Sequence, residues 1–148
     1  MRKLFFLLLL LPVIISCEEE IVDERDAFIG TWDMEIVGNL LLLQDNELAY
    51  SLPLSNNLEI EISKFGPFGN EMMIGTRMIC KLSGNKLSFE PESTVQSTNG
   101  LTLQLRITKS GVASNSIITI KESYSGVWLT SSEKGAISGS SNYTFIKK

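Results

Sequence analysis

The feature that most constrains the fold is a strict alternation of apolar and polar residues. The run 101–107 (LTLQLRI) places four aliphatic side chains on one face of an extended chain and three polar ones on the other. The runs 58–62 (LEIEI), 86–90 (KLSFE) and 142–145 (NYTF) alternate in the same way. Such alternation is typical of strands that have one buried and one hydrated face. We therefore predict an all-β protein.

Short turn signals separate the alternating runs. The triplets 55–57 (SNN), 83–85 (SGN) and 98–100 (TNG) contain the residues that tolerate a positive φ. Successive hairpins of this kind predict an antiparallel up-and-down meander, which removes its open edges by closing into a barrel. We expect an eight- (or nine-) stranded barrel with one helical turn at 23–28 before it. The expected strands are 30–37, 47–54, 58–64, 72–82, 86–90, 101–108, 115–122, 126–131 and 141–147.

The first sixteen residues have the composition of a signal peptide. Met1-Arg2-Lys3 is basic, and the apolar run from Leu4 to Ile15 follows. As a helix these twelve residues would extend about 18 Å, well short of the roughly 30 Å hydrocarbon core of a bilayer. A basic start, a short apolar run and a small residue before a break indicate secretion rather than a membrane-spanning anchor. We assign residues 1–16 to a signal peptide.

The sequence then changes at Cys17. Ile14-Ile15-Ser16-Cys17 resembles the lipobox of bacterial lipoproteins, which implies cleavage before Cys17 and lipidation of its thiol. In one group of Gram-negative bacteria, acidic residues after such a cysteine resemble a surface-export signal, and Glu18, Glu19 and Glu20 stand there. The resemblance implies an outer-membrane lipoprotein exposed on the cell surface, with a periplasm-facing anchor as the alternative. Residues 17–27 have the acidic composition of a solvated tether.

Residues 28–148 are long enough for one domain with its own core. If Cys17 is lipidated, Cys80 has no disulfide partner, and its apolar surroundings predict a small buried residue. The acidic balance, a formal net charge of −4, argues against nucleic acid as a partner.

The composition offers little for catalysis. Histidine is absent, which excludes the Ser-His-Asp relay, the Cys-His pair and the imidazole zinc site. Glu59 and Glu61 share a strand face, but that face lies opposite the aliphatic one and should point to solvent. Asp45-Asn46-Glu47 has oxygen ligands without the spacing of a calcium loop and is interpreted as a turn. We expect no enzyme activity, no metal site and no cofactor.

A family resemblance supports the barrel. Gly30-Thr31-Trp32 resembles the Gly-x-Trp motif of the lipocalins, and 25–32, 62–69 and 82–87 are similar to small lipocalin-like lipoproteins of largely unknown function. The resemblance implies that Gly30 permits close backbone approach and that Trp32 closes the base of the barrel. Classical lipocalins often pack an arginine of the last strand over this tryptophan. Here only Lys147 and Lys148 are available for a cation–π contact.

Two classes of function fit these observations. The first is a binding module, for which Phe65, Pro67 and Phe68 form a candidate mouth or contact loop that takes a protein partner or a small hydrophobic ligand. The second is an inhibitor or protective lipoprotein, because the run 138–143 (SGSSNY) is similar to the Ser-Gly-x-x-Tyr region of lipid-anchored lysozyme inhibitors. The inward-facing aliphatic residues predict a largely filled barrel with at most a shallow mouth.

Overall fold

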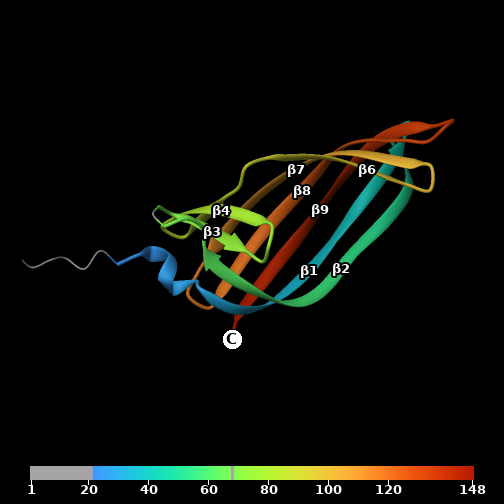
Figure 1. The fold of residues 1–148 in the computed structure, drawn as a ribbon. Coiled ribbons are helices and arrows are strands. Elements are labelled where there is room, and N and C mark those ends of the chain that lie inside the picture. The colour runs from blue at the N-terminus through green and yellow to red at the C-terminus, as the bar shows by residue number, and fades with distance from the viewer. Residues whose placement is uncertain (1–21, 68) are drawn as a thin grey trace, which may run out of the picture.

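The computed structural model describes residues 22–67 and 69–148, and this part of the chain is built almost entirely from β-strands (Figure 1). One 3-10 turn, η1, precedes the first strand and confirms the predicted helical turn. The elements are η1 (Glu24–Ala27), β1 (Gly30–Gln44), β2 (Glu47–Lys64), β3 (Glu71–Ile74), β4 (Met78–Ser83), β5 (Lys86–Ser88), β6 (Glu92–Thr98), β7 (Leu101–Ala113), β8 (Ile117–Leu129) and β9 (Lys134–Lys147).

The strands form a closed antiparallel meander, which confirms the predicted fold class. Neighbours in sequence are neighbours in the sheet, and β9 pairs with β1 to close the ring. The strand β5 pairs with the end of β7 and β6 with its beginning, so β6 continues along the same edge of β7. Three residues, 89–91, separate the end of β5 from the start of β6, whereas only two residues of β7, 108 and 109, lie between their pairing partners. Pro91 also lacks the N–H group that a hydrogen-bonded strand pair needs. The result is an eight-stranded lipocalin-like barrel with β6 as an added strand.

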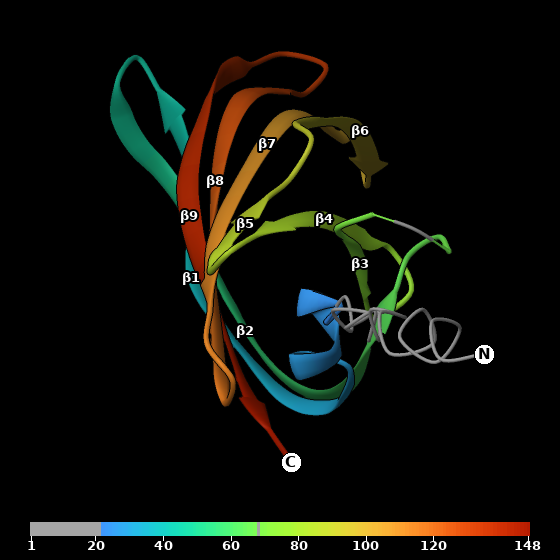
Figure 2. The same cartoon turned by 90° about the vertical axis from the view of Figure 1, so that its left-hand side faces the viewer.

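Only one half of the barrel is closed. The strand β2 pairs with β3 at Ile62–Lys64 alone, and its residues 47–60 have no second partner strand in the described part of the chain. Beyond that level the sheet β2-β1-β9-β8-β7-β6 is open, and its long hairpins extend away from η1 (Figures 1 and 2). We call the end near η1 the closed half and the other end the open half.

The closed half is filled by side chains, as the sequence predicted. Its core centres on Trp32, Ile62 and Phe145, none of which is exposed. The turn η1 lies within the ring of strands seen in Figure 2 and adds Phe28 to the core. The other buried members of this core are Met34, Met72, Ile74, Cys80, Leu82, Leu87, Ala113, Ile118 and Ile120.

Several predicted strand boundaries were wrong. The predicted turn at Ser55-Asn56-Asn57 does not exist, because these residues pair with β1 inside one continuous strand β2. The β1–β2 turn lies instead at Asp45-Asn46, whose φ angles of 52° and 67° suit a tight hairpin. The interpretation of residues 45–47 as a turn is thereby confirmed.

Other elements were divided or joined differently. The predicted strand 72–82 is the hairpin β3–β4, which turns at Gly75 with a φ of 62°. The predicted strands 115–122 and 126–131 are one strand, β8, and β6 was not predicted. The predicted turns at 83–85 and 98–100 are confirmed, with positive φ at Gly84, Asn99 and Gly100.

Candidate binding site on the inner face

Trp32 lies at the base of the barrel and is fully buried. Its indole Nε1 donates a hydrogen bond to the carbonyl oxygen of Phe28 at 3.0 Å, which links the base to the end of η1. The Nζ atom of Lys147 lies 5.7 Å from the Trp32 ring centroid and donates to the carbonyl oxygen of Ala27 at 2.6 Å. A lysine of the last strand therefore makes the expected cation–π contact.

Gly30 is required for a different reason than the one inferred from the sequence. A Cβ at this position would have no atom within 4 Å, so the backbone makes no close approach here. The φ angle of 127° is the constraint, because side-chain-bearing residues rarely adopt it. Gly30 thus shapes the entry into β1 rather than its packing.

The aromatic loop of residues 65–70 lies at the closed half, near η1. Arg25 in η1 donates from Nη1 to the carbonyl oxygen of Glu71 at 3.2 Å, and Val22 and Arg25 line a surface hollow together with Pro67. Phe65 and Pro67, which the sequence offered as a mouth or contact loop, lie at the closed half, because β2 runs from the open half back to the base. Their role as a contact loop stays a prediction. Phe68 lies outside the described residues.

The residues proposed for lipidation and export, Cys17 and Glu18 to Glu20, also lie outside the described residues, as does the signal peptide. Within the described part of the chain, no helix is both long and apolar enough to cross a bilayer. Cys80 is buried as predicted, and burial raises the pKa of its thiol to about 12.

A row of polar residues crosses the inner face between two apolar cores. Cross-strand pairing aligns Gly38 of β1, Ser141 of β9, Glu122 of β8 and Lys109 of β7. Directly paired residues present their side chains on the same face of a sheet, so this row faces inward with the neighbouring Ile120. We call it the polar row. It separates the core of the closed half from a second core in the open half, made of Leu40, Leu42, Leu103, Leu105, Trp128 and Ile137.

Glu122 is the unusual member of the polar row. Its exposed fraction is 4%, and its Oε2 atom has no hydrogen-bond partner among the residues that the structure describes. The hydroxyl groups of Tyr124 and Ser141 are 2.9 Å apart beside it. Burial raises the pKa of Tyr143 and Tyr124, and the nearby Glu122 carboxylate raises both further. The two tyrosines, each half-buried, therefore flank a buried acidic group.

Lys109 stands directly opposite Glu122 but is engaged elsewhere. Its Nζ atom lies 2.6 Å from Oε1 of Glu92, at the start of β6. The Lys109 side chain is buried, whereas the Glu92 side chain is exposed. The only lysine in the polar row is thus paired with the exposed carboxylate of Glu92.

The open half leaves apolar side chains exposed on the same inner face. Tyr50, Leu52 and Leu58 of β2 pair with inward-facing residues of β1, so their side chains lie on the inner face. Their exposed fractions are 62%, 41% and 42%, because β2 has no outer neighbour at this level. The strand β2 therefore forms an apolar wall on the same inner face as the tyrosines, at the open edge of the sheet. We call the inner face of the open half the trough.

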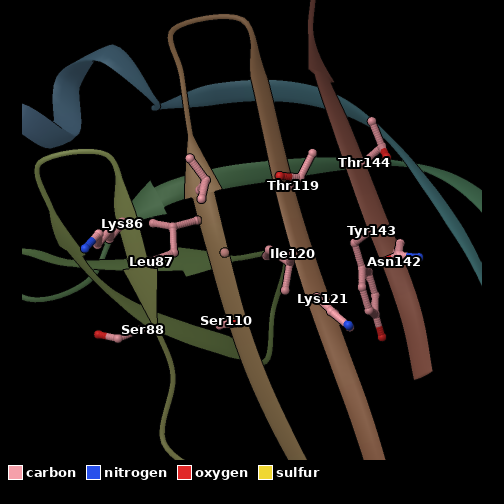
Figure 3. Close-up of a pocket in the computed structure, with 12 residues that line it drawn as sticks. Lys86, Leu87, Ser88, Ser110, Thr119, Ile120, Lys121, Asn142, Tyr143 and Thr144 are labelled. Carbon is pink, nitrogen blue, oxygen red and sulfur yellow. The ribbon is translucent and has the colours of Figure 1, made fainter. Parts of the chain in front are cut away.

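A separate hollow of about 620 Å³ lies on the outer face (Figure 3). Its polar side chains come from β5, β7, β8 and β9 and include Lys86 and Lys121. Ser88, Ser110, Thr119 and Thr144 belong to the outward-facing residues beside these lysines. Its lining contains no carboxylate and no cluster of metal-ligating residues; besides hydroxyl and ammonium groups it includes the Asn142 carboxamide and apolar residues such as Val112.

The polar row was not predicted because its residues fall at or beyond the predicted strand ends. Alternation from Ile118 and Ile120 continues to Glu122 and Tyr124, but the strands predicted at 115–122 and 126–131 left Ser123–Ser125 as a break. A continuous β8 places Glu122 inward. Lys109 was missed for the same reason, since β7 was expected to end at 108.

Comparisons with protein-family models, curated proteins and solved structures give no match to this chain. The described residues hold no group of three or more histidine, cysteine, aspartate or glutamate side chains that could bind a metal ion. The candidate site is therefore the trough with the polar row, whose chemistry is hydrogen bonding, charge and apolar contact.

Proposed function

We propose that this chain is a lipid-anchored, non-catalytic binding module that holds a small hydrophobic ligand in the trough. The observation that carries the proposal is the apolar wall of β2, which is exposed on the inner face that also carries the half-buried tyrosines. Exposed apolar side chains that share one concave face are typical of ligand sites. The closed half is filled, so binding would take place in an open trough rather than a deep cavity.

The proposed anchor suits this arrangement. Val22 lies at the η1 end, and five residues of chain span at most about 18 Å. A lipid on Cys17 would therefore hold the closed half near the membrane and direct the trough away from it. We place the protein at the outer membrane, with the acidic residues Glu18 to Glu20 favouring the cell surface. Protease treatment of intact cells would distinguish this location from the periplasm-facing alternative.

The inhibitor alternative gains no support from the geometry. The segment Ser138–Tyr143 lies within β9 in the middle of the sheet rather than on a projecting loop. Ser141 is buried and its hydroxyl is bonded to Tyr124, so it is not displayed to an incoming protein. A ligand module is therefore the better proposal.

A titration with an environment-sensitive apolar dye tests the function. The protein used is the mature chain from residue 17 with Cys17→Ala, which retains every described residue. Leu52→Glu places a charge on the apolar wall and should weaken dye binding about ten-fold or more. Val127→Glu is the matched control, because Val127 has nearly the same exposed fraction, 43% against 41%, on the outer face. Equal loss in both variants, or no dye binding by the parent protein, would refute the proposal.

A further inference from the structure

The inner face contains a buried carboxylate that its neighbours satisfy only in part. Tyr124 and Tyr143 lie close enough to Glu122 for its carboxylate to raise the pKa of both hydroxyls, but its Oε2 atom has no hydrogen-bond partner among the described residues. An unpaired buried oxygen is costly, and structures normally satisfy such groups. Glu122 lies on β8, on the same inner face as the apolar wall, with β9 and β1 between the two strands.

The charge balance around this oxygen is acidic. Lys109 is the nearest cation in the polar row, and it is bound to Glu92. Two acidic side chains, Glu122 and Glu92, share this part of the inner face with one basic side chain, Lys109. Little solvent screens groups that are this deeply buried, so acidic surroundings favour a cationic ligand over an anionic one.

We propose that the trough selects an amphiphilic amine, whose ammonium group donates to Oε2 of Glu122 while its apolar chain lies against β2. This inference rests on the proposed function and adds the chemical class of the ligand. An ammonium donor would make a charge-assisted hydrogen bond and supply the missing partner of Glu122. The faces of Tyr124 and Tyr143 add aromatic surface for a cation. Because Glu122 is buried, the ammonium group must displace part of its cover.

The same geometry disfavours a fatty acid. A ligand carboxylate at this level would meet the carboxylates of Glu122 and Glu92, and the one lysine is already paired. A neutral alcohol of the same length would bind between these two extremes. The inner face thus predicts an order of affinity: amine, then alcohol, then carboxylate.

Competition against the apolar dye tests this order with dodecylamine, dodecanol and dodecanoate, each kept below the concentration at which it aggregates. Dodecylamine should bind about ten-fold more tightly than dodecanoate to the mature Cys17→Ala chain. Glu122→Gln should remove most of this preference and change dodecanol binding little. Glu59→Gln is the control, because Glu59 is an exposed carboxylate on the outer face of β2.

A second variant guards against loss of folding in Glu122→Gln. Lys109→Gln removes the one cation of the row and should strengthen the preference for dodecylamine, a change opposite in sign to general damage. Equal binding of amine and carboxylate, or an unchanged ratio in Glu122→Gln, would overturn the inference and identify Glu122 as a structural carboxylate satisfied by water. Failure of the dye and all three probes to bind would instead refute the proposed function.

Discussion

Trp32 connects the start of the barrel to its end at the scale of a single residue. It fills the base, donates to Phe28 and lies under Lys147 of the last strand. One side chain therefore joins η1, β1 and β9. Trp32 should contribute strongly to the stability of the fold, because loss of its ring would leave a cavity that its buried neighbours cannot fill.

We expect Trp32→Ala to lower the free energy of unfolding by about 3–5 kcal/mol, the usual cost of truncating a buried aromatic residue. Denaturant melts measure this directly. Tyr50→Ala is the control, because Tyr50 is 62% exposed and should cost less than about 1 kcal/mol. Similar losses in the two variants would contradict the buried structural role of Trp32.

Asp23 forms a second residue-scale feature. It caps η1, pairs with the buried Arg25 at 2.7 Å and with Lys64 at 2.9 Å. The hydrogen bonds from Arg25 and then Lys64 hold the pKa of Asp23 far below its usual range. The residues that composition assigned to a tether are thus partly docked on the barrel.

This depressed pKa predicts a pH-dependent stability. The folded protein keeps the Asp23 carboxylate ionised below the ordinary pKa of 3.8, so the unfolded state binds more protons there. The stability that the ionised Asp23 contributes is fully present above pH 3.8, and it is lost as the pH falls toward the pKa of Asp23 in the folded protein. Asp23→Asn should therefore be less stable than the parent protein at pH 7, and the gap should narrow below about pH 4. A gap that stays constant between pH 7 and pH 3 would argue against the ion pair.

At the scale of elements, glycines allow the long strands of the open half to coil tightly. A Cβ on Gly126 of β8 would lie 1.9 Å from the carbonyl oxygen of Gln104 on β7. A Cβ on Gly38 of β1 would lie 2.4 Å from the carbonyl oxygen of Ser140 on β9. Neighbouring strands therefore approach one another more closely than side chains permit, and this curvature forms the trough.

Gly126→Ala should destabilise the protein by about 3 kcal/mol or more, because backbone atoms must move to admit the methyl group. Gly100→Ala is the comparison: this turn glycine has a φ of 80° with no atom near its Cβ position. Conformational strain alone should cost about 1–2 kcal/mol there. Thermal or denaturant unfolding of both variants gives the difference, and an equal cost would mean that β7 and β8 separate easily.

At the scale of the whole molecule, the two ends have different roles. The closed half holds the core and η1, whereas the open half carries the apolar wall and the second core. With the proposed anchor before η1, the molecule would stand on its closed half. The membrane contact and the ligand would then lie at opposite ends of one sheet.

Replacing Cys17 with Ala should release the protein from the membrane fraction, because the substitution removes the thiol that would carry the proposed lipid. Cell fractionation followed by detection of the protein measures this. Ser16→Ala keeps the cysteine and serves as the control. A Cys17→Ala protein that still sediments with membranes would show that the attachment lies elsewhere.

Alternation of apolar and polar residues was enough to predict an all-β chain and the buried face of its longest alternating runs. Alternation placed Leu103, Leu105, Ile118 and Ile120 inward, and the structure buries all four. The turn at Asn99-Gly100 was also readable, because few residues accept its backbone angles. The expected contact between a terminal lysine and Trp32 is confirmed too. The buried faces and the turn depend on local geometry, which the order of residues specifies directly, whereas the lysine contact was expected from the family resemblance.

Pairing between distant strands sets where each strand ends and which polar residues face inward. Ser55–Asn57 has the composition of a turn, but pairing with β1 keeps the chain extended. The predicted strands ended at Glu122 and at Thr108, but continuous β8 and β7 carry Glu122 and Lys109 onto the inner face. The length of β3 leaves residues 47–60 of β2 without a second neighbour and so opens the trough. Alternation determines which residues share a face of a strand. The length of the strand and the exposure of its faces depend on its pairing partners, which lie far away in the chain.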